Sequence, residues 1–185
     1  WWRHFDDRLG LSRDELARVS GHPAASLPAR ETLLADKPEH MVPWGKRRPP
    51  VERTDPANRW GFDMVLPDGF QHMGEIYNLS VRRGTLTAED RFRINEHIVR
   101  TYIMLCSLPW PSHLSRVPEM AATHHERLDG RGYPRRLTAP DLTIPDRVMA
   151  LADVFEALTV GDRPYKSAKT LSESLRIMTD MATEG

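Results

Sequence analysis

The pattern of hydrophobic and polar residues divides this 185-residue chain into two parts of different character. From about residue 70 onward, apolar residues recur at the spacing of amphipathic helices, and no stretch alternates as a strand would. Between Pro23 and Pro67 the chain has no sustained period and holds many of its 15 prolines. We therefore predict an all-α domain over residues 71–185, preceded over residues 1–70 by a short helix and a proline-rich, mostly irregular extension or linker.

Capping residues place the ends of the predicted helices. Ser12 and Glu15 have the spacing of a capping box and predict a short helix in the first part. The segment 64–81 is ambiguous, apart from a turn at Pro67-Asp68-Gly69. In the second part, Thr87, Thr143 and Thr170 each precede an acidic residue at the same spacing. Four helices are predicted there, over residues 88–106, 119–127, 144–160 and 171–182.

Composition and charge exclude several classes of protein. Lys+Arg and Asp+Glu both total 26, so the net charge is zero, which argues against a nucleic-acid binder that relies on bulk positive charge. The single cysteine, Cys106, cannot form an internal disulfide and suits a reducing cytosol. No apolar run approaches the roughly 20 residues of a membrane span. We expect a cytoplasmic protein. Because the chain begins with Trp1 and not with Met, we interpret it either as a fragment of a longer protein or as a numbering of ordered residues only.

Asp153 lies in the segment "VMALADVFEALTV", which is apolar on nearly every side. Such a helix is predicted to be buried. A carboxylate inside it would cost several kcal/mol unless it were paired, hydrogen-bonded or bound to a metal. Two interpretations stay open: Asp153 caps a neighbouring helix or pairs with an arginine, or it is a metal ligand.

Three histidines strengthen the second interpretation. His124 and His125 are adjacent near a helix end, so we expect their side chains to diverge by about 100°. In that arrangement they would serve two metals about 3.5–4 Å apart, or one metal and one substrate phosphate, rather than one metal from one face. Together with His97 and Asp153 they would form a nitrogen and oxygen site for Fe, Mn, Zn or Ni. Any one of these histidines alone is more often a surface or core residue.

The turn after the histidine pair and a later loop offer groups that could hold a substrate. Gly130 and Gly132 permit positive φ and close backbone approach, and Tyr133 precedes a proline. The turn is either a simple helix end or a loop that brings an aromatic ring and backbone donors to the metals. Arg163 and Lys166 are either solvated cations or the groups that bind a phosphodiester.

Taken together, three segments of the chain resemble the HD-GYP family of bacterial cyclic di-GMP phosphodiesterases. They are "HHERLDGRGYP", "ALADVFEALTVGDRPYK" and "GTLTAEDRFRINEHIV", and the resemblance covers about residues 75–182. It implies an HD-type helical bundle with a bi- or trinuclear metal site that hydrolyses cyclic di-GMP to pGpG or GMP. It also implies that the chain stops short of the usual last helix.

The resemblance also assigns roles to individual residues. It implies that the metal ligands are His97, His124, His125 and Asp153. It implies that Arg163 and Lys166 hold the phosphate or guanine of the substrate. The turn with Gly132 and Tyr133 would form a wall of the substrate site.

The chain departs from the family at the His-Asp dipeptide that gives the family its name. The expected window reads "DGFQHMGEIYNLSV", with Met73 at the position of the Asp and Glu75 at that of the lysine. Because the missing Asp bridges two metals in the family, we expect one metal to be weakened or lost. His72 and Glu75 are candidate replacement ligands, and the alternative is that Glu75 is a surface or structural residue.

These observations leave three hypotheses for the function. The first is a metal-dependent phosphohydrolase acting on cyclic di-GMP with one or two divalent ions and weak or no turnover. The second is a degenerate domain that binds cyclic di-GMP, or a partner such as a diguanylate cyclase domain, without hydrolysis. The third is an HD-type hydrolase for another phosphorylated nucleotide. A homodimer is compatible with each, and neither nucleic acid nor membrane is expected as a partner of this segment.

Overall fold

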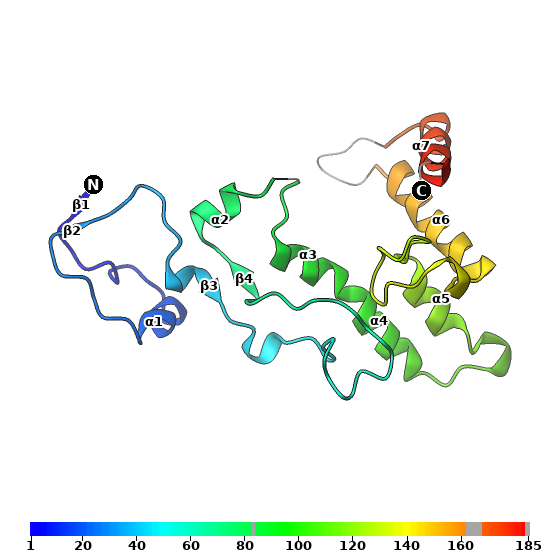
Figure 1. Ribbon diagram of the computed structural model, residues 1–185, viewed down its shortest axis with the longest axis horizontal. Helices are drawn as coiled ribbons and strands as arrows, with labels where there is room; N and C mark the ends of the chain where they lie inside the picture. The colour runs from blue at the N-terminus through cyan, green and yellow to red at the C-terminus, as the bar shows by residue number, and fades with distance from the viewer. Residues whose placement is uncertain (83, 162–167, 184–185) are drawn as a thin grey trace. The chain divides into compact units, whose positions relative to one another are not determined.

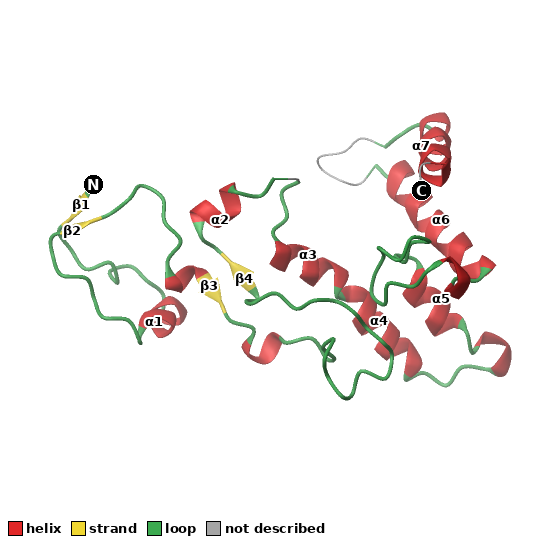
Figure 2. Ribbon diagram, in the orientation of Figure 1, coloured by secondary structure: helices red, strands yellow, loops and turns green. Residues whose placement is uncertain are grey.

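A computed structural model describes residues 1–82, 84–161 and 168–183 of the chain. Helices and loops make up nearly all of it, and the strands are two short antiparallel pairs (Figure 2). The predicted all-α class is confirmed by this mainly helical structure. Within the described ranges, no helix combines the length and the apolar composition needed to cross a lipid bilayer.

The chain forms two compact units that are discontinuous in sequence. Residues 1–49 and 66–94 form the first unit, and residues 50–65 and 95–185 form the second. Part of the proline-rich segment, residues 50–65, thus packs with the helices that follow it.

The first unit contains short elements joined by long loops (Figure 1). Trp44 is its buried centre, with Phe70 and Phe92 packed edge-on against the indole ring at 5.4 and 5.6 Å. The predicted capping box of Ser12 and Glu15 begins its first helix. Its elements are β1 (Trp2–Arg3), α1 (Arg13–Val19), β2 (Ala29–Arg30), η1 (Pro38–His40), β3 (Met41–Val42), η2 (Gly45–Arg47), β4 (Gln71–His72), α2 (Glu75–Leu79) and α3 (Ala88–Asn95). Strand β1 pairs with β2, and β3 pairs with β4.

The second unit contains the larger helices. Helix α5 packs against α4 and against α6, and α6 packs against α7. A segment of loops and one short 3₁₀ helix joins the end of α5 to the start of α6 (Figure 1). The elements are α4 (His97–Cys106), η3 (Ser112–Leu114), α5 (Val117–Thr123), η4 (Ala139–Asp141), α6 (Ile144–Thr159) and α7 (Leu171–Thr183).

A small hydrophobic core holds α4 against the loop of residues 50–65. Ile98 and Val99 of α4 are buried with Val51 and Phe62 of the loop. Tyr102, one helical turn further along α4, contacts the Phe62 ring edge-on at 5.9 Å. This packing fixes the start of α4, where His97 lies.

We expect Ile98→Val to lower the free energy of unfolding by about 0.5–1.5 kcal/mol, because it removes one buried methylene from a fully covered side chain. Urea unfolding followed by circular dichroism measures the change. The exposed Ile94 provides the matched control, since Ile94→Val removes the same group at a residue that is 51% exposed. Equal losses in both variants would contradict the assignment of Ile98 to the core.

Two predicted helices have different bounds in the structure. The helix predicted over residues 88–106 is divided at Glu96, where Val99 donates its N–H to the Glu96 carbonyl in a tighter turn of the 3₁₀ type. The helix predicted over residues 119–127 begins earlier and ends at Thr123.

The prediction that α6 is buried was wrong. Val148 and Leu151 are 57% and 51% exposed, and Asp153 is 42% exposed at its side chain. Among the described elements, α6 packs chiefly against α5 and α7, and much of its apolar surface stays exposed. Because the carboxylate of Asp153 is partly exposed, it does not incur the free-energy cost of desolvation that the sequence suggested.

Candidate metal centre

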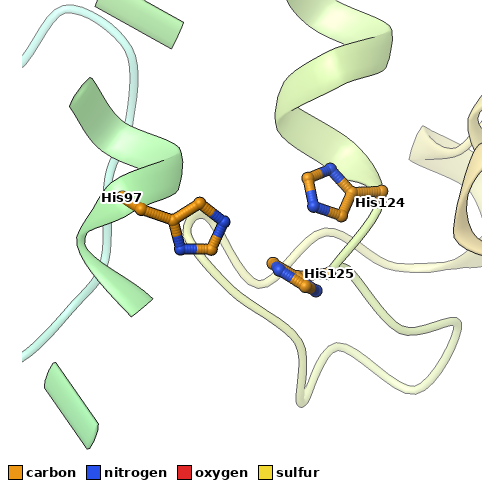
Figure 3. A group of neighbouring side chains, drawn as sticks. All are labelled: His97, His124 and His125. Carbon is orange, nitrogen blue, oxygen red and sulfur yellow. The ribbon is translucent and has the colours of Figure 1, made fainter. Parts of the chain in front are cut away.

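Three histidines from two helix ends converge in the second unit. His97 is the first residue of α4, His124 is the C-cap of α5, and His125 follows it. One ring nitrogen of each lies within 4.8 Å of one from each of the others. Figure 3 shows the three rings turned toward one another. Three imidazoles at this separation form a donor set that suits a first-row divalent metal.

The structure corrects the expected divergence of the two adjacent histidines. Their ring centroids are 4.0 Å apart, and the His125 ring lies 5.3 Å from that of His97. The angle of about 100° describes only the directions in which the side chains leave a helix, and each ring can turn about two further bonds. His124 and His125 can therefore contribute nitrogen atoms to one metal ion together with His97.

A hydrogen bond selects the tautomer of the neutral His124 ring. Its Nδ1 lies 2.7 Å from the carbonyl oxygen of Ala121, one turn earlier in α5. Because a carbonyl only accepts, Nδ1 must carry the proton, which leaves the lone pair of Nε2 for a metal.

His125 is held in the neutral form that metal binding requires. Its pKa is lowered from 6.5 to about 4, chiefly by burial and also by the neighbouring His124 and His97, while Asp153 acts in the opposite direction. A neutral imidazole at physiological pH presents a lone pair without first losing a proton.

Asp153 reaches the edge of this histidine cluster. Its Oδ2 lies 3.8 Å from Nδ1 of His125, which is too long for a hydrogen bond. The group of mutually close ligand atoms comprises the three histidines without Asp153. A direct ligand role for Asp153 stays a prediction.

The turn after the histidines folds back against them. Gly130 has a φ of +73°, as the sequence suggested. At Gly132 the requirement is space, because a Cβ there would lie 2.4 Å from backbone atoms of Glu126 and Arg127. This approach brings Tyr133 to His125, where the rings stack at 4.7 Å and the Tyr133 N–H donates to the His125 carbonyl. Burial, with Asp153 nearby, raises the pKa of Tyr133 to about 12.

Glu126 holds this turn together by hydrogen bonds from within, a role that the sequence did not reveal. Its side chain is buried, and its two oxygens accept the backbone N–H groups of Arg135 and Leu137 at 2.7 and 2.9 Å. Burial raises the pKa of Glu126, and these hydrogen bonds oppose the rise. The only signal in the sequence was its place in the signature segment directly after the histidines.

We expect Glu126→Gln to lower the free energy of unfolding by about 1–3 kcal/mol. The amide nitrogen of glutamine cannot accept a hydrogen bond, so one buried backbone N–H loses its partner. Thermal or urea unfolding measures the loss. Glu156→Gln on the exposed side of α6 is the matched control, with an expected change within about 0.5 kcal/mol. Equal stability of the two variants would show that the hydrogen bonds of Glu126 do not stabilise the turn.

Arg135 ties the far end of the turn to two helices, and the sequence did not reveal this contact either. Its guanidinium donates to Glu119 of α5 at 2.7 Å. The second oxygen of Glu119 accepts the hydroxyl of Tyr102 of α4 at 2.8 Å. The turn is thereby connected to both helices that carry the histidines.

Two of the remaining predicted site residues, His72 and Glu75, belong to the first unit. The Nδ1 of His72 accepts the Gly74 N–H, and its ring stacks on Tyr77 at 4.1 Å. Glu75 accepts the N–H of Ala35 at 3.1 Å. Their roles as ligands stay predictions. Arg163 and Lys166 lie outside the described residues.

Helical fold and clustered histidines together define a helical-bundle protein with a candidate centre for a divalent metal. A family model described as HD domain matches residues 28–184. The chain therefore belongs to the HD domain family, as a divergent HD-GYP member without the His-Asp dipeptide.

Curated relatives are similar over shorter segments. A cyclic di-GMP phosphodiesterase of Thermotoga maritima is 38% identical over 96 residues, which cover 52% of this chain and 26% of the relative. Two proteins of Vibrio cholerae, 3'3'-cGAMP-specific phosphodiesterases 1 and 3, are 52% and 34% identical over 64 and 95 residues. These segments cover 35% and 51% of this chain, and 15% and 20% of the relatives. The chain thus spans about a quarter or less of the length of these proteins.

Proposed function

We propose that this chain is a metal-dependent phosphodiesterase domain that acts on a cyclic dinucleotide, with cyclic di-GMP as the first substrate to test. The observation that carries the proposal is the convergence of His97, His124 and His125 within 4.8 Å. The names of the relatives support the substrate class, since they refer to cyclic di-GMP and to 3'3'-cGAMP.

The residues of the cluster have separate tasks in this proposal. A bound divalent ion would polarise the phosphodiester and lower the pKa of a water molecule. His124 offers Nε2 because Ala121 holds its other nitrogen protonated. His125 stays neutral through burial, and Tyr133 covers one face of its ring. Arg163 and Lys166 are proposed to bind the phosphate or guanine of the substrate.

The proposed activity is weak, because Met73 replaces the acidic residue that bridges two metals in the family. We expect slow conversion of cyclic di-GMP to pGpG or GMP with Mn²⁺ or Fe²⁺ in excess, and none with EDTA. Glu75→Ala tests the candidate replacement ligand. Vigorous turnover that Glu75→Ala leaves unchanged would contradict this account, since neither acidic group would then be needed.

A second candidate is a module that binds cyclic di-GMP without hydrolysis. The absent His-Asp dipeptide favours it. Metal analysis of the purified chain and calorimetry with cyclic di-GMP separate the two functions. If the metal-free chain binds cyclic di-GMP and no hydrolysis is detected with any metal, the chain is a binding module.

A further inference from the structure

Helix α6 has an unusual anchor. Its apolar side chains at Ile144, Val148 and Leu151 are all more than half exposed, so hydrophobic burial holds it weakly. The buried residue of this helix is instead an acid, Asp146, which is 2% exposed. Such a carboxylate must be well hydrogen-bonded, and its partners therefore determine how α6 is seated.

The partners of Asp146 come from three places. Its Oδ2 accepts the N–H and the hydroxyl of Thr143, the N-cap of its own helix, at 2.9 and 2.5 Å. Its Oδ1 accepts the hydroxyl of Thr123, the last residue of α5, at 3.1 Å, and the same hydroxyl is shared with the carbonyl oxygen of Met120, also at 3.1 Å. The Arg116 guanidinium lies 3.6 Å away. Oδ2 thus caps α6 and faces Arg116 at the start of α5, and Oδ1 connects α6 to the end of α5.

The connection to α5 is made next to the histidine pair. Thr123 is itself 2% exposed and directly precedes His124 in the chain. Asp153 follows Asp146 by seven residues, which is about two helical turns, so both acids lie on one face of α6. The first reaches the residue before the histidines, and the second reaches His125 at 3.8 Å.

We propose that Thr123 and Asp146 form a lock that sets the register of α6 against the end of α5 and thereby holds Asp153 beside His125. They are positioning residues, because they act through Asp153 and touch neither a ligand atom nor a substrate. The proximity of Asp153 to His125 is independent of any function, whereas its effect on metal affinity rests on the proposed function.

The lock is tested first on the metal-free chain. Nuclear Overhauser contacts between the β-protons of Asp153 and the His125 ring report their proximity directly. We expect Thr123→Val to weaken these contacts and Thr123→Ser, which keeps the hydroxyl, to preserve them. Thr143→Ala is the matched control, since it removes a hydroxyl that donates to the same carboxylate, together with the contact of that hydroxyl with Arg116, but leaves the bond from Thr123 to Asp146 in place. Full retention of the contacts in a folded Thr123→Val chain would overturn the lock.

Metal affinity tests the consequence of the lock. We expect Thr123→Val to lower affinity for Mn²⁺ about tenfold, as loss of an outer-shell partner does. The same change in an Asp153→Ala background should lower it less than about twofold, since the residue being positioned is gone. Equal losses in both backgrounds would indicate general destabilisation and overturn the lock. A parent chain that binds no Mn²⁺ would refute the proposed function, and the proton contacts would still decide the lock.

Discussion

Replacing His125 by alanine is expected to lower the affinity of the chain for Mn²⁺ or Zn²⁺ by more than about 100-fold and to abolish hydrolysis of cyclic di-GMP. Loss of an outer-shell partner typically costs 10–100-fold in affinity, and a direct donor should cost more. His125 is the ring closest to both other histidines, with centroids at 4.0 and 5.3 Å. Its removal leaves two nitrogen donors, which hold a divalent ion poorly.

Two further variants separate ligand loss from structural damage. His125→Phe keeps a ring for Tyr133 to stack on but offers no lone pair, so it should lose the metal while the chain stays folded. His113→Ala removes an exposed histidine of η3 and should leave affinity unchanged. Calorimetric titration measures each affinity, and circular dichroism checks the fold. Undiminished metal affinity in His125→Phe would show that His125 is not a metal ligand.

Helix ends were the part of the fold that the sequence predicted best, because a cap depends on residues only three positions apart. Each predicted capping pair forms its hydrogen bonds in the structure. The pairs are Ser12 with Glu15, Thr87 with Asp90, Thr143 with Asp146, and Thr170 with Glu173. The identities of the clustered histidines were also predicted, since the signature segment contains two of them.

Features that depend on distant residues could not be predicted in the same way. The exposure of α6 depends on which elements cover it, and no local pattern contains that information. The convergence of His124 and His125 depends on side-chain torsions at a helix end that lay earlier than expected. Glu126 looked like one charge among several, because its two amide partners lie nine and eleven residues further along the chain.

The pKa of His125 makes the metal-free chain less stable in mild acid. In the folded chain this pKa is about 4, whereas the unfolded value is 6.5. Between these values the unfolded state binds the additional proton, so the free energy of unfolding falls as the pH falls from about 6.5 to about 4. A shift of this size corresponds to about 3 kcal/mol, and solvent screening of the partly exposed ring reduces that figure.

We therefore expect His125 to account for about 2 kcal/mol of lost stability at pH 4.5 relative to pH 7, as measured by urea unfolding in EDTA. Other groups also titrate over this range. The informative quantity is therefore the difference in the free energy of unfolding between the parent and His125→Phe, because phenylalanine has no proton to bind at this position. Between pH 7 and pH 4.5 the parent should lose about 2 kcal/mol more of its free energy of unfolding than His125→Phe loses. Glu126 acts in the opposite direction. Burial raises its pKa, so protonation of this carboxyl at low pH stabilises the folded state. Parallel stability curves for the parent and His125→Phe would show that His125 is not held neutral by burial, and with that the cluster would lose its ready lone pair at acidic pH.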